Sequence, residues 1–277
     1  IDYLSTSCEC SREQTNWPFV IMPNVLITGG AKRIGAHLAR RFAREGFKVV
    51  IHYNASALHA ETLCDELNQN RKCCWLVQGD LSLSAEIETV FEHARQAVGP
   101  IDVCINNASS FLNDDMSAIH GDHFENHMNV NLKAPVHFAR LLRDQKEWAE
   151  DRLVINLLDN KVFAINPDFF TYTLSKSALL TATEMMAMQF NGTPRVCGIA
   201  PSITLISGKQ TQENFEKSSR INPMSRKVFP SDICDAAVFM WKTKGYDKQV
   251  IIIDAGQTTL NLPRDVAFYI KEGLLDG

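Results

Sequence analysis

A regular alternation of short apolar runs with helix-length segments constrains the fold of this chain more than any other feature. Apolar runs of this length are typical of buried strands, and the segments between them are long enough for helices. Strands that are apolar throughout and separated by helices indicate a parallel sheet covered on both faces. The predicted strands are residues 25–28, 47–53, 73–80, 101–108, 153–158, 195–201 and 249–256.

The intervening segments are predicted as helices. The first has an apolar stripe at Ile34, Leu38 and Phe42 and ends at Gly46. We therefore expect an α/β fold, a Rossmann-type doubly wound parallel sheet of about seven strands with helices on both faces. Further helices are expected over residues 57–70, 84–98, 122–146, 170–190 and 231–243.

The chain has no internal repeat and no Pro/Gly/Ser-rich linker, so we expect one domain over residues 22–277. Residues 1–21 lack the basic start and apolar stretch of a secretory signal, and they show no periodicity. We interpret them as an appended irregular segment, with Met22 as the natural start.

Charge and composition limit the partners. The net charge of −4 and a pI near 6.1 give no electrostatic reason to expect nucleic acid or an anionic membrane surface. The eight cysteines are scattered, mostly inside apolar segments, as is typical of reduced thiols in a cytoplasmic protein. Cys8 and Cys10 have no cluster of Cys or His nearby, so we predict no metal site.

The sequence TGGAKRIG, Thr28–Gly35, follows the first strand and begins the first helix. A glycine turn at a helix N-terminus offers free N–H groups and a partial positive charge, which suits a pyrophosphate. Gly29 and Gly35 stand at the usual tight positions, but Arg33 occupies a place that is often glycine.

The second strand ends in His52-Tyr53-Asn54-Ala55-Ser56 and carries no carboxylate. An acidic residue there would bond the ribose 2′-hydroxyl of NAD, whereas this sequence would accept a 2′-phosphate. We therefore predict NADPH rather than NADH, with His52, Asn54 and Ser56 as donors. The alternative is that His52 and Tyr53 merely complete the end of the strand.

Tyr172 and Lys176 are four residues apart in a predicted helix. That spacing returns to nearly the same helix face, so the phenol and the ammonium are expected to be neighbours. A nearby cation would lower the phenol pKa and make Tyr172 a more effective acid. By itself this pair is a common coincidence.

In combination these motifs resemble the short-chain dehydrogenase/reductase family over residues 24–256. The resemblance consists of the first turn, Asn-Asn-Ala (106–108), the Tyr172–Lys176 pair, Asp80-Leu81 and Asn131. It implies a nucleotide cofactor, an active-site role for Asn131, and tetramers that assemble through the helices at 122–146 and 170–190.

Within the family, three departures resemble the pteridine reductases. Most members have a serine thirteen positions before the tyrosine, where this chain has Asp159; Arg33 and the stretch 107–111 are the others. The resemblance implies that Arg33 contacts both cofactor phosphates and substrate, that Phe111 stacks on a pterin, and that Ser109 bonds both ligands. The alternatives are that Phe111 is a residue of the core and that Asp159 only caps a turn.

The expected activity is therefore NADPH-dependent reduction of a pterin, possibly of a folate, with Tyr172 as the proton donor. Asp159 would relay the proton or orient Tyr172, and Lys176 would hold the ribose and lower the phenol pKa. Ser202 stands where the family has glycine, and residues 205–226 are expected to cover the substrate. The cofactor-binding residues implied are Gly29, Arg33, Ile34, Gly35, His52, Tyr53, Asn54, Ser56, Asp80, Leu81, Asn107, Ala108, Ser109, Leu157, Tyr172, Lys176, Pro201, Ile203 and Thr204.

Two rival interpretations stay open. One is a carbonyl reductase of the same family with a 3-oxoacyl or quinone substrate, although Asp159 in place of serine argues against it. The other is a regulatory protein that binds NADPH without turnover, which the intact Tyr172 and Lys176 argue against.

Overall fold

Seven short strands form one parallel sheet in the computed structural model, which describes residues 22–119, 121–146, 151–208 and 210–273. The order β3-β2-β1-β4-β5-β6-β7 confirms the predicted Rossmann-type fold. Residues 1–21 lie outside the described residues, so the interpretation of that segment stays a prediction. The strands are β1 (Asn24–Ile27), β2 (Lys48–Tyr53), β3 (Cys74–Gln78), β4 (Val103–Asn106), β5 (Leu153–Leu157), β6 (Arg195–Pro201) and β7 (Val250–Ile253).

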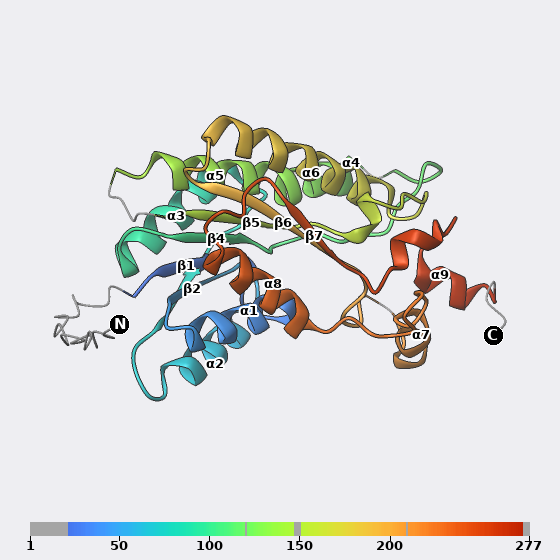
Figure 1. Cartoon of the computed structure of the whole chain (residues 1–277), viewed down its shortest axis with the longest axis horizontal. Helices are drawn as coiled ribbons and strands as arrows, with labels where there is room; N and C mark the ends of the chain where they lie inside the picture. Colours follow the sequence, from blue (N-terminus) through green and yellow to red (C-terminus); the bar gives the residue numbers. More distant parts are fainter. Residues whose placement is uncertain (1–21, 120, 147–150, 209, 274–277) are drawn as a thin grey trace, which may run out of the picture.

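Helices cover both faces of this sheet (Figure 1). On one face lie α1 (Arg33–Arg44), α2 (Ala57–Asn68) and α8 (Pro230–Lys242); on the other lie α3 (Ser84–Val98), α5 (Ala134–Asp144) and α6 (Phe170–Phe190). Successive residues of a strand point to opposite faces, so Val25 and Ile27 pack in the first layer and Leu26 in the second. Burial on both faces explains why the strands are apolar throughout.

The predicted helical region over 122–146 contains a π-helical turn. Helix α4 (Gly121–Met128) passes into a π-helical turn, η1 (Asn129–Lys133), before α5 begins. Pro135 has no N–H to donate to the carbonyl of residue 131, while Ala134 N–H donates to the carbonyl of Asn129. The predicted helical region is therefore confirmed from Gly121 to Asp144, with one π-helical turn inside it.

Short elements that the sequence did not predict gather near the carboxyl edge of the sheet. They are α7 (Gln212–Ser218), α9 (Val266–Lys271) and the 3₁₀ turns η2 (Asn160–Val162) and η3 (Gln257–Leu260). Helices α7 and α9 pack against each other beside this edge (Figure 1). None of the helices in the described part of the chain has the length and hydrophobicity to span a bilayer.

Gly35 is needed where the first turn approaches α1. A Cβ at this position would overlap the carbonyl oxygen of Gly29 and lie 2.8 Å from the Cα of Gly30, and both are backbone atoms that cannot rotate away. Gly35→Ala is expected to lower the free energy of unfolding by about 1–3 kcal/mol, measured by urea denaturation. Gly121→Ala is the control, because a Cβ at Gly121 meets open space and should be neutral or slightly stabilising. Equal stability of both variants would contradict the crowding at Gly35.

Candidate active site

A cleft of about 880 Å³ opens at the carboxyl edge of the sheet, and residues following β1, β2, β4, β5 and β6 line it. The strand order reverses between β1 and β4, and such a crevice is the usual ligand site of a doubly wound sheet. Most of the predicted site residues meet there. Those that line the cleft are Gly29, Arg33, Ile34, His52, Asn54, Asp80, Leu81, Asn107, Ala108, Ser109, Phe111, Leu157, Asp159, Tyr172, Lys176, Pro201, Ile203 and Thr204.

The turn between β1 and α1 contains two residues with left-handed backbone conformation. Gly29 has φ +60° and Arg33 has φ +55°. Glycine adopts this region freely, whereas an arginine there costs about 1–2 kcal/mol. The guanidinium of Arg33 donates a hydrogen bond to the backbone carbonyl of Ile206, in the segment after β6. Arg33 thus connects two sides of the cleft from a position that favours glycine.

The N-terminus of α1 faces the cleft without an anionic partner in its own sequence. Its first turn contains no acidic residue, and its N-cap, Lys32, makes no side-chain capping bond. Lys32 and Arg33 both line the cleft. Two cations at a helix N-terminus would repel its dipole, so this arrangement favours an anionic ligand.

His52 is buried and supports the first turn. Its Nδ1 accepts a hydrogen bond from the N–H of Gly29 at 3.1 Å, and its Nε2 lies 3.0 Å from the carbonyl oxygen of Gly79. Burial lowers the pKa of His52 to about 4, so the ring is neutral, with the proton on Nε2. Both ring nitrogens therefore have backbone partners, and the prediction that His52 donates to a 2′-phosphate was wrong.

The end of β4 is joined to the same turn through Asn107. Its side-chain amide donates to the carbonyls of Thr28 and Gly29 at 2.9 and 3.0 Å. The Thr28 hydroxyl in return accepts from the N–H groups of Asn107 and Ala108, both at 3.0 Å. These bonds hold the floor of the cleft and explain the role of this asparagine.

Asn131 does not line the cleft but holds one of its walls. It is fully buried in the π-helical turn. Its amide donates to the Ser110 carbonyl and the Ser175 hydroxyl, and its oxygen accepts from the Ser110 N–H and the Ser109 hydroxyl. Asn131 therefore holds Ser109 and Ser110 in place, and its predicted active-site role stays a prediction.

Tyr172 and Asp159 meet in the cleft although they belong to different elements. Asp159 follows β5, and Tyr172 stands in the first turn of α6. The Tyr172 hydroxyl donates to Asp159 Oδ2 at 2.8 Å, and the Lys161 N–H donates to Asp159 Oδ1 at 2.9 Å. Both carboxylate oxygens are therefore engaged, and the phenol is oriented by an acidic group.

The electrostatics of this group differ from the prediction in one respect. Burial, with a smaller contribution from Asp159, raises the pKa of Tyr172 well above its ordinary value. Burial also raises the pKa of Asp159 and lowers that of Lys176 to about 8. Lys176 is not among the groups that shift the pKa of Tyr172, and its ammonium donates to the Leu157 carbonyl at 2.7 Å, so the predicted lowering of the phenol pKa does not appear. Tyr172 therefore keeps its proton at neutral pH.

Aromatic rings form one wall of the cleft. Phe111 stacks on Phe169 with ring centroids 4.4 Å apart, and the edge of Tyr172 meets Phe111 at 4.6 Å. Phe169 in turn stacks on Phe268 of α9 at 5.7 Å. Phe111 is 39% exposed, which places it at a surface rather than in the core. Sequence reasoning predicted Phe111 but missed Phe169.

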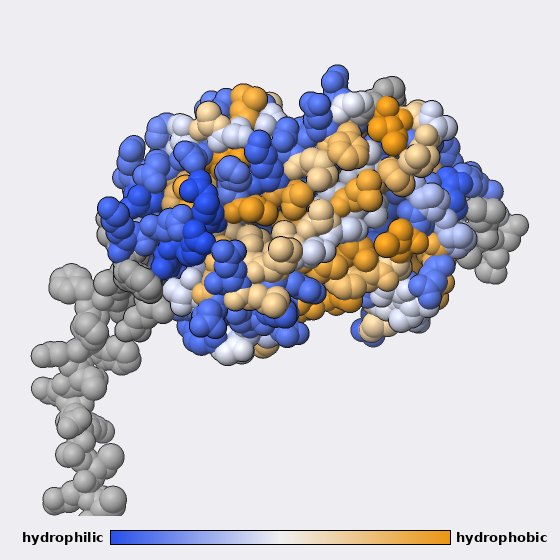
Figure 2. All heavy atoms as spheres, turned by 90° about the horizontal axis from the view of Figure 1, so that it is seen from above, coloured by the Kyte–Doolittle hydropathy of each residue, from blue (hydrophilic) through white to orange (hydrophobic). Residues whose placement is uncertain are grey.

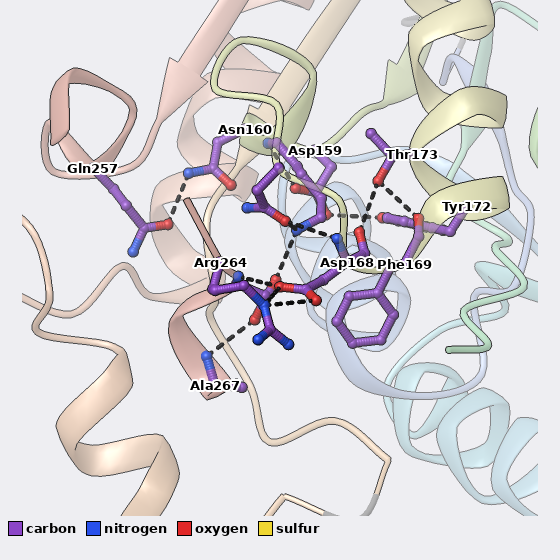
Figure 3. Close-up of polar contacts among 12 residues, drawn as sticks. Asp159, Asn160, Asp168, Phe169, Tyr172, Thr173, Gln257, Arg264 and Ala267 are labelled. Atoms are coloured by element: carbon purple, nitrogen blue, oxygen red, sulfur yellow. Dashed lines mark hydrogen bonds and ion pairs between the residues drawn. The ribbon is translucent and has the colours of Figure 1, made fainter. Parts of the chain in front are cut away.

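Residues after β7 also line the cleft, although no motif in the sequence indicates them. Figure 3 shows polar contacts that join the loop around Asp159 to this C-terminal segment, including the bond from Asn160 to Gln257 at 2.9 Å. Leu205, Ser207 and Gly208, from the segment 205–226 predicted to cover the substrate, line the cleft beside Ser202. The lining residues that were not predicted are Lys32, Ser110, Asn126, Val130, Leu158, Asn160, Phe169, Gln257, Asp265, Val266 and Ala267.

Three other predicted residues do not line the cleft. Gly35 packs under the first turn, as its crowded surroundings show. Tyr53 is half-buried against the core, and Ser56 is the N-cap of α2 without a side-chain capping bond. For these three the structure offers a structural role.

Comparisons with known proteins agree with this geometry. The family profile described as short chain dehydrogenase matches residues 23–217. The structure of FolM alternative dihydrofolate reductase 1 from Brucella canis complexed with NADP has a TM-score of 0.81 and 33% identity, covering 87% of this chain and 96% of that one. The Brucella suis protein in complex with NADP gives 0.82 and 35%, covering 86% and 95%. Pteridine reductase 1 of Leishmania tarentolae is 25% identical over 266 residues, 80% of this chain and 91% of that one.

The buried His52 predicts a pH dependence of stability. Its pKa of about 4 in the fold lies below the ordinary value of 6.5, so between these values the unfolded chain binds more protons. The stabilisation from neutral His52 is complete above pH 6.5 and is lost as the pH falls towards 4, by about 3 kcal/mol. Urea denaturation from pH 4 to 7 should show a weaker dependence in His52→Gln than in the wild type. Identical slopes would contradict the buried neutral ring.

Proposed function

This chain belongs to the short-chain dehydrogenase family, and we propose that it catalyses the NADPH-dependent reduction of a pterin. The hydrogen bond from Tyr172 to Asp159 carries the proposal, because it places a proton donor and an acidic partner in a cleft that also holds Arg33. The similarity to FolM alternative dihydrofolate reductase and to pteridine reductase supports the same substrate class.

The residues at the first turn fit a dinucleotide. Backbone N–H groups at the α1 N-terminus, together with Lys32 and Arg33, suit the negative charge of a diphosphate. The end of β2 presents Asn54 rather than a carboxylate, which favours the 2′-phosphate of NADP. When bound, NADPH supplies the hydride. The other residues proposed to hold it are Gly29, Ile34, Asp80, Leu81, Asn107, Ala108, Ser109, Leu157, Lys176, Pro201, Ile203 and Thr204.

The protein's own contribution is the proton and the orientation of the ring. Tyr172, neutral because burial raises its pKa, donates its hydroxyl proton to a ring nitrogen of the substrate. Asp159 orients the phenol through Oδ2; after the transfer it takes up a proton from water and passes it to the Tyr172 phenolate. Lys176, fixed by the Leu157 carbonyl, holds the ribose side of the cleft.

The substrate slot is proposed to lie between the aromatic wall and the cofactor. Phe111 offers the flat surface against which a bicyclic heteroaromatic ring would stack. The guanidinium of Arg33 and the hydroxyl of Ser109 are the polar groups that would orient this ring. A planar, nitrogen-rich ring fits this combination better than a flexible acyl chain.

We further propose that the protein forms a homotetramer and acts in the cytoplasm. Helix α6 has apolar residues on its outer face as well as on its buried face, with Leu174, Met185 and Met188 exposed. Figure 2 shows hydrophobic residues crossing the surface seen from above, the side of α5 and α6 in Figure 1. An apolar face of this kind is typical of an interface. The free, buried thiols of the described cysteines suit a reducing compartment.

Removal of either member of the proton pair tests the mechanism. Tyr172→Phe and Asp159→Ala are each expected to lower kcat at least tenfold, because proton donation of this kind contributes about 10²–10⁴-fold. Loss of NADPH absorbance with dihydrobiopterin measures turnover, and fluorescence titration with NADPH shows that the cofactor still binds. Unchanged turnover in both variants would contradict the mechanism.

The same assay decides the substrate class. Wild-type protein is expected to oxidise NADPH with dihydrobiopterin or dihydrofolate and not with an acetoacetyl thioester. Turnover of the thioester alone would indicate a carbonyl reductase, and NADPH binding without turnover of any substrate would indicate a regulatory protein. Either result would contradict the proposal.

A pair of variants at Arg33 separates its function from its backbone cost. Arg33→Gly and Arg33→Ala both remove the guanidinium, and both are expected to raise KM for the pterin at least tenfold. Only glycine relieves the left-handed backbone, so Arg33→Gly should be more stable than Arg33→Ala by about 1 kcal/mol in urea denaturation. Unchanged KM in both variants would remove Arg33 from the substrate site.

A further inference from the structure

Lys161 is a buried cation on the loop that carries Asp159, and the proposed mechanism does not use it. Its side chain is 6% exposed. The ammonium donates to Asn166 Oδ1 at 2.6 Å and pairs with Asp265 Oδ2 at 3.0 Å. A buried ammonium without partners would cost several kcal/mol, so these acceptors offset its desolvation.

Lys161 also contacts the proton pair directly. Its backbone N–H donates to Oδ1 of Asp159 at 2.9 Å, while Tyr172 donates to the other oxygen of the same carboxylate. The Lys161 ammonium lies 5.6 Å from the centroid of the Phe169 ring, which is stacked on Phe111. Lys161 therefore lies against Asp159, the aromatic wall of the cleft and the C-terminal segment.

Asp265, the ion-pair partner of Lys161 in the C-terminal segment, is held by hydrogen bonds of its own. Its N–H donates to Asp168 Oδ2 at 2.7 Å, and its Oδ1 caps α9 by accepting from the Ala267 N–H at 3.0 Å. Arg264 adds an ion pair to Asp168 at 2.9 Å. Figure 3 shows these contacts between Asp168, Arg264 and Ala267 in one network beside Asp159. Asp265 and Ala267 line the cleft, so this docking forms part of its wall.

We propose that Lys161 is a positioning residue for the Asp159–Tyr172 pair. Lys161 and Asp265 place two opposite charges near Asp159, and the ion pair between them docks residues 264–271 as a wall of the cleft. This inference rests on the role given above to Asp159. It adds a specific electrostatic function to a lysine whose side chain would otherwise serve only packing.

The charged groups around Asp159 make the effect of each partner distinguishable. Tyr172 and Lys176 face it from α6, Lys161 from its own loop, and Asp265 from the C-terminal segment. Burial is the main cause of its raised pKa; Lys161 lowers this pKa and Asp265 raises it. A packing role alone would make the loss of either partner act in the same direction, whereas the electrostatic role requires opposite directions.

The test compares Lys161→Met, Asp265→Asn and the double variant in the NADP⁺ complex. Infrared difference spectroscopy follows the protonated carboxyl band that is absent in Asp159→Asn, which gives the pKa of Asp159. Lys161→Met is expected to raise this pKa by about 0.5–1 unit and Asp265→Asn to lower it by a similar amount. The double variant should lie near the wild type. Lys217→Met, which removes an exposed cation from α7, is the matched control and should leave the pKa unchanged.

Shifts in the same direction, or no shift in either single variant, would overturn the inference. If Lys161→Met does not fold, Asp265→Asn and the double variant still decide, because Asp265→Asn must lower the pKa and the double variant must restore it. The titration needs no substrate. If the two pKa shifts are opposite but the protein does not turn over a pterin, only the proposed function is contradicted. If the protein turns over a pterin but the two pKa shifts are not opposite, only this inference is contradicted.

Discussion

The hydrogen bond between Tyr172 and Asp159 depends on how β5 and α6 pack at the carboxyl edge of the sheet. Asp159 follows β5 and Tyr172 begins the return helix α6, so the 2.8 Å contact forms only if that strand and that helix are correctly packed. Burial raises the pKa of both groups, so the phenol stays neutral and the carboxyl is harder to ionise. The cleft is thereby equipped to hold a proton close to the aromatic wall formed by Phe111.

Arg33 lies at the same carboxyl edge of the sheet, in the turn between β1 and α1. Its backbone stands in a conformation that favours glycine, at a cost that folding must offset elsewhere. Its guanidinium reaches across to Ile206, and together with Lys32 it makes the N-terminus of α1 positively charged. Strain retained beside a ligand cleft is typical of a functional position, and here it supports the proposed contacts with an anionic cofactor and a nitrogen-rich ring.

The sequence predicted what periodicity and spacing control. The parallel sheet followed from apolar runs and the Tyr172–Lys176 pair from helix spacing, whereas the place of Asp159 beside them followed only from the family resemblance. The fold and the family assignment are confirmed. Long-range partners were not predictable in the same way. His52 was predicted to donate to the cofactor but is tied to Gly79, just after β3, and no pattern in the sequence indicates that Lys161 is buried. The C-terminal wall has no periodicity, so nothing in the sequence placed it at the cleft.

A crystal structure of the complex with NADP⁺ and a dihydropterin would decide whether this cleft is a pterin site. We expect the pterin to stack on Phe111, with a ring nitrogen hydrogen-bonded to the Tyr172 hydroxyl and Arg33 released from the Ile206 carbonyl to contact the ligand. A pterin bound elsewhere, with Arg33 still on Ile206 and the Tyr172–Asp159 pair remote from any ligand, would contradict it.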